Sequence, residues 1–234
     1  MIEYDKGYRK FGGASERLMR LSFIGMSGTG KSHWSSQLVE QGYQRFCCDD
    51  LIEQRLKPEL TASDGMTISM GAWMGFPYET HYPEREAKYL RYEVGILTEI
   101  LSYIEANPRH NRNIIIDTTG SVIYTGNDLL ERLKKLTTIV YLDTPLAVQE
   151  RMRSAYCTNP APVVWREKFN QQPDETHEAA LARCYPDLLA SRTHEYKKWA
   201  DITLDYHQLR QPTFGVDDFL NELSHIYPVV EKAF

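Results

Sequence analysis

The segment GMSGTGKS at residues 25–32 places the strongest constraint on how this chain folds. An apolar run, LSFI, precedes it and a stretch with helical periodicity follows it. This is the strand–loop–helix context that a G-x-x-x-x-G-K-S phosphate-binding loop (P-loop) requires. The glycines let backbone N–H groups surround phosphate oxygens, and the N-terminus of the next helix adds partial positive charge. The sequence therefore predicts a nucleoside triphosphate site at this loop.

The side chains of this loop predict binding of ATP together with Mg²⁺. We expect the Lys31 ammonium to bridge β- and γ-phosphate oxygens and the Ser32 hydroxyl to ligate Mg²⁺. His33 follows directly, at the start of the predicted helix. The residues predicted to bind the nucleotide are Gly25, Ser27, Gly28, Thr29, Gly30, Lys31, Ser32 and His33.

Short apolar runs alternate with longer amphipathic stretches, which is typical of βα units around a parallel sheet. The pattern predicts an α/β, three-layer P-loop NTPase fold with a five-stranded parallel sheet. The predicted strands are Leu21–Ile24, Tyr43–Cys47, Asn113–Asp117, Thr138–Leu142 and Ile202–Leu204. The predicted helices are Lys31–Gln41, Asp49–Leu56, Pro83–Ala106, Asn127–Leu136, Pro145–Ala155, Glu175–Trp199 and Val216–Ile226.

Two stretches interrupt this alternation of predicted strands and helices. Lys57–His81 is rich in Gly, Met, Thr and aromatic residues, and Tyr156–Pro173 holds three prolines and little periodicity. Loops of this length in compact domains are usually lids or binding loops. The predicted organisation is an N-terminal extension at 1–19 and a P-loop kinase domain at 20–234, with a substrate-binding region at 57–106 and a lid at 156–175.

The composition excludes several classes of partner. A net charge of −5 and an isoelectric point near 5.8 argue against a broad basic surface for nucleic acid or acidic membranes. No apolar run approaches the ~20 residues that a membrane span needs. The four cysteines, Cys47, Cys48, Cys157 and Cys184, follow no zinc spacing and are expected to be reduced. We expect a cytoplasmic monomer or weak dimer that binds ATP and a small-molecule hydroxyl acceptor.

Residues after the second and third strands favour a kinase over other P-loop proteins. The chain has no N-K-x-D segment to read guanine, and its third strand ends in IIIDTTG with a single acid, Asp117. Asp49 and Asp50 follow the second predicted strand directly. Carboxylates at strand ends line the ligand site of open α/β sheets, where one of them could orient an acceptor hydroxyl. These acids could instead cap the next helix.

Three stretches resemble shikimate kinase and its small-molecule kinase relatives. The first is the P-loop unit LSFIGMSGTGKS, and the second is Cys47–Glu53, CCDDLIE, which is similar to the family's D-x-D-x-x-I-E. The third combines IVYLD at 139–143 with LLASR at 188–192, Tyr196 and ADITLD at 200–205. It is similar to the family's V-Y-L-D strand and its L-L-x-x-R-x-x-x-Y-x-x-x-A-D-I-T-V-D ending.

The resemblance implies roles for individual residues. Asp49 matches the acid that contacts the substrate hydroxyls and helps to deprotonate the attacking one, while Cys47 stands where the family has its metal-side acid. Asp117 or Asp50 would then take the metal-side role. Arg192 matches the arginine that pairs with the substrate carboxylate, a contact suited to guanidinium geometry. The alternative for Arg192 is a solvated ion pair on a helix surface.

Other parts of the family's pattern are incomplete here. Arg85 and Arg91 are both candidates for its second substrate arginine, and Gly120 alone carries over from its Gly-Gly-Gly segment. The lid arginine has no counterpart near Asn159 and Ala161, so Arg153 or Arg166 would replace it.

The sequence thus predicts an ATP- and Mg²⁺-dependent kinase, with Lys31, Asp49 and Asp117 as catalytic residues and a small anionic metabolite as acceptor. Asp49, Arg85, Arg91, Gly120 and Arg192 are the predicted substrate-binding residues, and Ser32 and Asp117 are the predicted metal ligands. The alternatives are a kinase of a sugar acid, nucleotide or polynucleotide end, and a nucleotide-binding switch without an acceptor.

Overall fold

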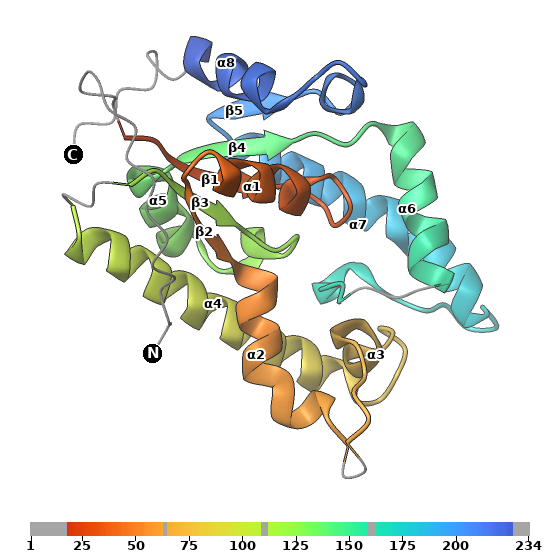
Figure 1. The fold of residues 1–234 in the computed structure, drawn as a ribbon. Coiled ribbons are helices and arrows are strands. Elements are labelled where there is room, and N and C mark those ends of the chain that lie inside the picture. Colours follow the sequence, from red (N-terminus) through yellow and green to blue (C-terminus); the bar gives the residue numbers. More distant parts are fainter. Residues whose placement is uncertain (1–17, 63–64, 109–111, 159–161, 227–234) are drawn as a thin grey trace.

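The structure, a computed structural model, describes residues 18–62, 65–108, 112–158 and 162–226 (Figure 1). In this part of the chain the strands form one five-stranded parallel sheet in the order β2-β3-β1-β4-β5. The strands are β1 (Arg20–Ile24), β2 (Gln44–Cys47), β3 (Ile114–Asp117), β4 (Thr138–Leu142) and β5 (Ile202–Leu204). The predicted fold class is confirmed, and each strand begins within one residue of its prediction.

Helices connect these strands, and short 3₁₀ turns occur in the loops. The α-helices are α1 (Lys31–Glu40), α2 (Cys48–Leu60), α3 (Met70–Met74), α4 (Tyr82–Ala106), α5 (Asn127–Leu136), α6 (Leu146–Thr158), α7 (His177–Trp199) and α8 (Val216–Ile226). The 3₁₀ turns are η1 (Val122–Tyr124), η2 (Arg166–Lys168) and η3 (Gln208–Arg210). Among the described residues, none of these helices combines the length and the apolar composition that crossing a bilayer demands.

The stretch Lys57–His81 is more ordered than its sequence predicted. Helix α2 continues past Pro58 to Leu60, because Leu60 is buried against the hydrophobic core and packing outweighs the weak propensity around the proline. Helix α3 was not predicted. It begins after Ser69, whose side chain accepts a hydrogen bond from the Ala72 N–H, and it buries Trp73 in the core.

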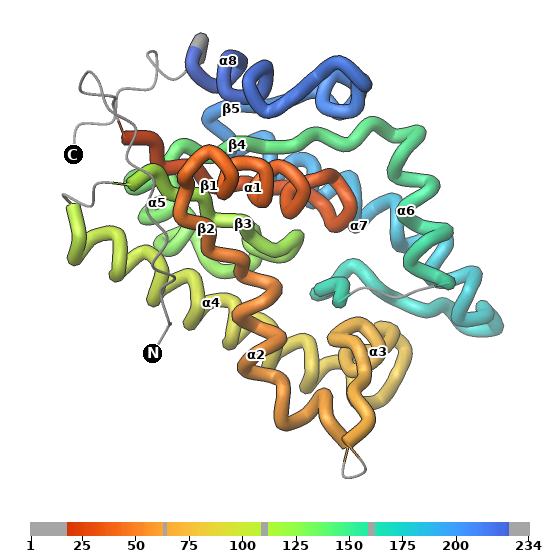
Figure 2. Tube along the Cα trace, viewed as in Figure 1, coloured from red at the N-terminus to blue at the C-terminus, as the bar shows by residue number. Residues whose placement is uncertain are grey.

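The sheet separates two hydrophobic clusters, because alternate residues of each strand point to opposite faces. Ile115 and Val140 face the cluster under α1 and α8, whereas Ile114 and Ile139 face the cluster under α4, α5 and α7. Figures 1 and 2 show α1 and α8 over one face and α4, α5 and α7 over the other. The result is a three-layer arrangement with the sheet in the middle.

The strand order places the carboxyl ends of three strands next to each other. β1 lies between β3 and β4, and the register sets Phe23 of β1 and Cys47 of β2 beside Asp117 of β3. β3 thus separates β2 from β1, so the residues after β2 face the loop after β1 across the end of β3. In open α/β sheets this edge, where the strand order reverses, is where ligands bind.

Phe219 of α8 tests the packing on the α1 and α8 side of the sheet. Its ring stacks on Trp34 of α1 with centroids 4.7 Å apart, and it is completely buried. We expect Phe219→Ala to lower the free energy of unfolding by about 3–5 kcal/mol, measured by urea denaturation, because it removes a buried aromatic ring and leaves a cavity. Asn221→Ala, at an exposed site of the same helix, should change it by less than about 0.5 kcal/mol. Equal effects of the two changes would contradict this packing.

Candidate functional site

The loop between β1 and α1 needs glycine where it leaves the sheet. Gly25 has a φ of 143°, and a Cβ atom there would lie 2.9 Å from the Leu142 carbonyl oxygen of the neighbouring strand. Gly30 precedes α1 with a φ of 106°, a left-handed conformation that glycine adopts without strain. Ser27 and Gly28 at the tip of the loop are exposed. The loop therefore offers an accessible backbone turn in front of the N-terminus of α1.

Lys31 lies across this loop, and its side chain is buried. Its Nζ donates to the carbonyl oxygens of Gly25 and Met26 at 2.8 and 2.9 Å. Burial lowers the pKa of Lys31, and the nearby carboxylates of Asp49 and Asp117 offset part of that effect. The lysine, the loop and the two predicted acids therefore meet at one place.

A pocket of about 330 Å³ opens beside the first turn of α1. It is lined by Gly30, His33, Trp34, Leu209, Arg210, Gln211 and Phe214. The Arg210 guanidinium donates to the carbonyl oxygens of Gly28 and Thr29 at 3.2 and 3.0 Å, so it ties the loop after β5 to the phosphate loop. Rings and a guanidinium beside a phosphate loop suit a flat heterocycle. His33 lines this pocket, whereas residues 209–214 carry no local motif and were missed from the sequence.

Asp117, at the end of β3, forms a buried ion pair beside α1. Its Oδ2 accepts from Arg45 of β2 at 2.6 Å and from the Ser35 hydroxyl of α1 at 2.9 Å. Arg45 also lies 3.9 Å from Asp50, whose side chain is 64% exposed. The sequence predicted neither the pairing with Arg45 nor the bond from Ser35. Asp117 therefore contacts Ser35, which lies one helical turn after Ser32 on α1, and Arg45 balances the charge of Asp117.

The donor set near Ser32 fits Mg²⁺ when phosphate supplies further oxygens. Among the described residues, no cluster of three or more His, Cys, Asp or Glu side chains could hold a metal by itself. Mg²⁺ in phosphoryl-transfer sites keeps several waters and uses one or two protein oxygens. The Ser32 hydroxyl, exposed in the first turn of α1, and the Asp117 carboxylate would hold it. Burial raises the pKa of Cys47 to about 12, so this thiol stays protonated.

Asp49 lies in the first turn of α2 and faces the phosphate loop. Its Oδ1 accepts a hydrogen bond of 3.1 Å from the Tyr89 hydroxyl of α4. Burial raises the pKa of Asp49, while Lys31 and the Tyr89 hydroxyl act in the opposite direction. The residue that precedes α2 is Cys47, so Asp49 and Asp50 do not occupy the capping position that the sequence left open. The carboxylate of Asp49 is thus held between a lysine and a phenol.

Glu93 of α4 is a site residue that sequence reasoning missed. It is 2% exposed and accepts hydrogen bonds from the hydroxyls of Thr119 and Ser121, the second at 2.6 Å. The pKa of Glu93 is raised to about 7, chiefly because the side chain is buried. The hydrogen bonds from Ser121 and Thr119 offset part of that rise. Glu93 follows Tyr89 by four residues on a helix, and this spacing was the signal that could have placed both on one face.

Arg192 and Gly120, two of the predicted substrate-binding residues, lie close together beside the phosphate loop. A Cβ atom on Gly120 would lie 3.4 Å from an Arg192 nitrogen and 3.5 Å from the Ser27 backbone nitrogen. Arg192 is 5% exposed, and its Nη2 donates to the Val164 carbonyl at 2.7 Å. Its buried Nε has no hydrogen-bond partner among the described residues. Arg192 is therefore not the solvated surface residue that the alternative reading required.

The other two predicted substrate arginines lie elsewhere on α4. Arg85 donates to the Trp73 carbonyl of α3, and its guanidinium lies 5.6 Å from the centroid of the Trp73 ring. Arg91 is exposed, and it lies two residues, or about 200° around the helix, from both Tyr89 and Glu93. The structure thus turns Arg85 toward α3 and Arg91 away from the site.

The described part of the predicted lid is fastened to α4 and α7. Glu86 accepts hydrogen bonds from the backbone N–H groups of Trp165 and Arg166 at 2.7 and 2.8 Å. The side chain of Trp165 is completely buried. The predicted lid positions Asn159 and Ala161 lie outside the described residues. Of the two replacement arginines, Arg153 pairs with Glu150 on the exposed surface of α6 and Arg166 is exposed in η2.

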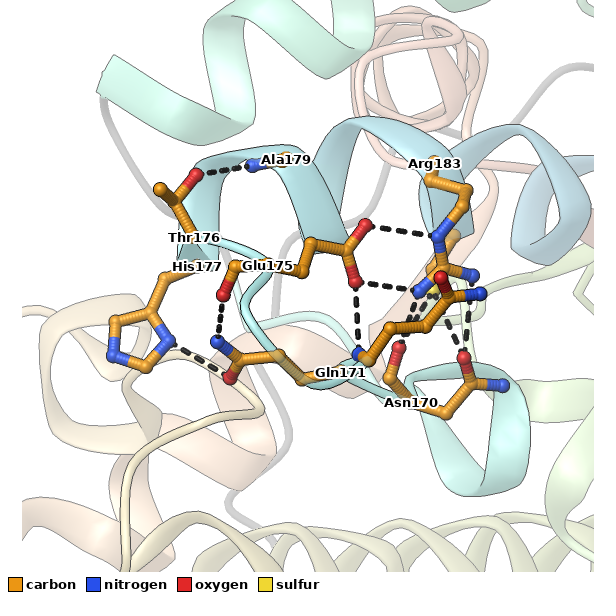
Figure 3. A network of polar contacts seen from close by, with 9 residues as sticks. Asn170, Gln171, Glu175, Thr176, His177, Ala179 and Arg183 are labelled. Atoms are coloured by element: carbon orange, nitrogen blue, oxygen red, sulfur yellow. Dashed lines mark hydrogen bonds and ion pairs between the residues drawn. The ribbon is translucent and has the colours of Figure 1, made fainter.

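Residues 170–177 form a compact turn that packs against the start of α7 (Figure 3). Glu175 accepts two hydrogen bonds from Arg183, which also donates to Asn170. The Arg183 contact lowers the pKa of Glu175 to about 2. His177 stacks on Tyr78, with ring centroids 4.0 Å apart, and so joins this turn to the segment between α3 and α4. The predicted lid itself contacts the predicted substrate-binding region through Phe169, whose ring centroid lies 6.4 Å from that of Tyr78.

Comparison with known proteins agrees with this architecture. The family model described as AAA domain matches residues 21–172, which include the phosphate loop and β1 to β4. No curated protein has significant sequence similarity to the chain.

Solved structures of shikimate kinases share the fold. The enzyme from Acinetobacter baumannii, solved in complex with shikimate, is 20% identical, with a TM-score of 0.57 over 92% of this chain and 97% of that chain. The enzyme from Bacteroides thetaiotaomicron is 15% identical, with a TM-score of 0.54 over 92% and 99%. The enzyme from Aquifex aeolicus is 18% identical, with a TM-score of 0.52 over 88% and 96%. The predicted likeness to the shikimate kinase fold is confirmed.

Titration of Glu93 should appear in the pH dependence of stability. Its pKa rises from 4.5 in the unfolded chain to about 7 in the fold, so its contribution is full below pH 4.5 and is lost as pH rises through 7. We expect the unfolding free energy of the wild type, relative to Glu93→Gln, to fall by about 3 kcal/mol between pH 4.5 and pH 8. Urea denaturation of both proteins at several pH values measures this difference. A difference that stays flat with pH would contradict the assignment.

Proposed function

Because the chain belongs to the AAA domain family, we propose that it is an ATP- and Mg²⁺-dependent phosphotransferase that acts on a hydroxyl group of a small molecule. The observation that carries the proposal is the meeting of Lys31 and Asp49 at the phosphate loop, from elements on either side of β3. The Lys31 ammonium is suited to neutralise phosphate charge on the donor, and the Asp49 carboxylate is suited to accept the proton of the acceptor hydroxyl.

The donor half of the proposal rests on the loop and the neighbouring pocket. The triphosphate would bind to the backbone of residues 25–32 at the N-terminus of α1, where N–H groups and the helix dipole favour anions. Lys31 would exchange its contacts with the Gly25 and Met26 carbonyls for phosphate oxygens. The base would enter the pocket beside Trp34, Arg210 and Phe214, which Arg210 connects to the loop.

The acceptor half rests on Asp49. In the proposed reaction the acceptor hydroxyl oxygen forms a bond to the γ-phosphorus, and the bond from that phosphorus to the β-phosphate oxygen breaks to release ADP. The hydroxyl proton passes to the Asp49 carboxylate, which Tyr89 holds toward Lys31. Bound Mg²⁺ would neutralise charge on the phosphates. Ser32 and Asp117 would hold it, and Arg45 would keep Asp117 in place.

The fold shared with shikimate kinases supports a small hydroxylated acceptor on the Asp49 side of the loop. The second arginine expected for an anionic acceptor has no counterpart beside Glu93, because Arg85 and Arg91 point elsewhere. Arg192, beside Ser27 and Gly120, supports a contact with the acceptor or with the transferred phosphoryl group.

Lys31→Ala tests the donor site. We expect at least a tenfold loss of ADP affinity in isothermal titration calorimetry, and a loss of ATP turnover of about 10³-fold or more with hydroxylated acceptors, because a buried phosphate-neutralising charge disappears. Lys197→Ala removes an exposed lysine of α7 and should leave both values unchanged. Undiminished ADP affinity in Lys31→Ala would refute the proposed donor site.

Asp49→Asn tests the acceptor role separately. We expect ADP affinity within about twofold of the wild type but phosphoryl transfer slower by about 10²–10⁴-fold, since the amide does not accept the proton. Product formation followed by phosphorus NMR or by ADP release checks this. Asp128→Asn, an exposed aspartate at the start of α5, serves as the matched control. Transfer rates equal to wild type in Asp49→Asn would rule out the role.

A further inference from the structure

One side of α4 faces Asp49, the loop after β3 and residues 163–166, and its polar side chains are acids and phenols. Its buried inward side chains are Tyr82, Glu86, Tyr89 and Glu93, which recur at helical spacing and are all less than 9% exposed. The cations of the same part of α4 point elsewhere. Arg85 binds the Trp73 carbonyl, Lys88 pairs with Glu59 of α2, and Arg91 is exposed. Helix α4 thus contributes negative charge and hydroxyl groups, and no cation, to this side of the site.

The carboxylates of Asp49 and Glu93, on the α2 and α4 side of the site, already accept hydrogen bonds from hydroxyl groups. Asp49 accepts from Tyr89, and Glu93 accepts from both Thr119 and Ser121. An ionised carboxylate only accepts hydrogen bonds and offers about four lone-pair positions, so lone pairs remain on Asp49 for a further donor. The chemistry that complements Asp49 is therefore a ligand hydroxyl group, while a ligand carboxylate there would place acceptor against acceptor.

The charges around Asp49 and Glu93 also disfavour an anionic acceptor. Lys31 and Arg192 are the cations that act on Asp49 and Glu93, respectively, in the described part of the site. In the proposed reaction Lys31 is engaged by phosphate, which leaves Arg192 against two carboxylates. Arg192 also gives one nitrogen to the Val164 carbonyl. Arg45 is paired with Asp117. A carboxylate or phosphate on the acceptor would therefore add a third negative charge beside Asp49 and Glu93, away from bulk water where the repulsion is strong.

We propose that the acceptor is a neutral polyhydroxylated molecule without a carboxylate or phosphate group, and that Glu93 is the residue that excludes anionic acceptors. This inference rests on the proposed phosphotransferase function and names the substrate class of the same site. Asp49 accepts a hydrogen bond from the reacting hydroxyl group of the acceptor, and the negative charge of Glu93 repels anionic acceptors. Glu93 is thus a specificity-determining residue with no part in proton transfer.

Pairs of compounds that differ only in an anionic group provide the test. Shikimate with its methyl ester, and glucuronate with glucose, keep most of their hydroxyl groups while the carboxylate is neutralised or absent. We expect the full chain, saturated with ADP and Mg²⁺, to bind a neutral member at least tenfold more tightly than its acid in calorimetry at pH 8. Transfer from ATP should follow the same order. Equal or tighter binding of the acids, or no binding of either neutral compound, would overturn the inference.

Glu93→Gln separates a role in selection from a role in folding. We expect the neutral-to-acid preference to fall at least fivefold while ADP affinity stays within twofold of the wild type. Glu105→Gln removes a carboxylate from the exposed surface of the same helix, where it pairs with Arg132, and should leave the preference unchanged. An unchanged preference for the neutral compounds in well-folded Glu93→Gln would overturn the role of Glu93. The substrate class is decided separately, by the compound pairs measured on the wild-type protein.

The outcomes of these tests separate the two proposals. Lys31-dependent ADP binding together with a preference for acids would contradict the neutral acceptor and leave the phosphotransferase proposal intact. Loss of Lys31 dependence would contradict the phosphotransferase proposal, whatever compounds bind.

Discussion

The buried ammonium of Lys31 is the interaction on which the rest of the site depends. Removing a cation from water is costly unless opposite charges or oriented dipoles surround it, and here two loop carbonyls and the acids Asp49 and Asp117 do so. The strand order makes this arrangement possible, because it sets the ends of β2 and β3 beside the loop after β1. The Lys31 side chain thus holds the loop through two carbonyl groups and lies within electrostatic range of both carboxylates.

Each buried acid of the site has its own partner from a different element. Arg45 of β2 balances Asp117, Tyr89 of α4 binds Asp49, and Arg192 of α7 acts on Glu93. Buried charges are tolerated when they are paired and hydrogen-bonded, so these contacts also constrain where α4 and α7 lie against the sheet. The surroundings of Asp117 and of Glu93 are therefore distinct environments within one site, because Arg45 offsets the first acid and Arg192 the second.

The segments that were expected to form separate regions are joined by packing. Glu86 and Arg192 hold the backbone of residues 164–166, and His177 stacks on Tyr78. The hydrogen bond that Arg192 donates to the Val164 carbonyl links this segment to a residue beside the phosphate loop. Arg210 links the loop after β5 to the phosphate loop. Arg210 therefore contacts the phosphate loop directly, whereas Arg192 lies beside Gly120, which neighbours the same loop.

The sequence by itself determined the phosphate loop, the order and type of the strands and of every helix except α3 and the short 3₁₀ turns, and the place of Asp49 after β2. These depend on local backbone geometry and on short periodic patterns. The glycines of residues 25–30 and the apolar runs of the strands are signals of this kind. Only the tertiary structure decided that Arg45 pairs with Asp117, that Glu93 and Arg210 belong to the site, and that Arg91 points away from it. Each depends on which helix or loop packs beside which strand end, and these contacts join residues from about 30 to 180 positions apart that no local pattern encodes.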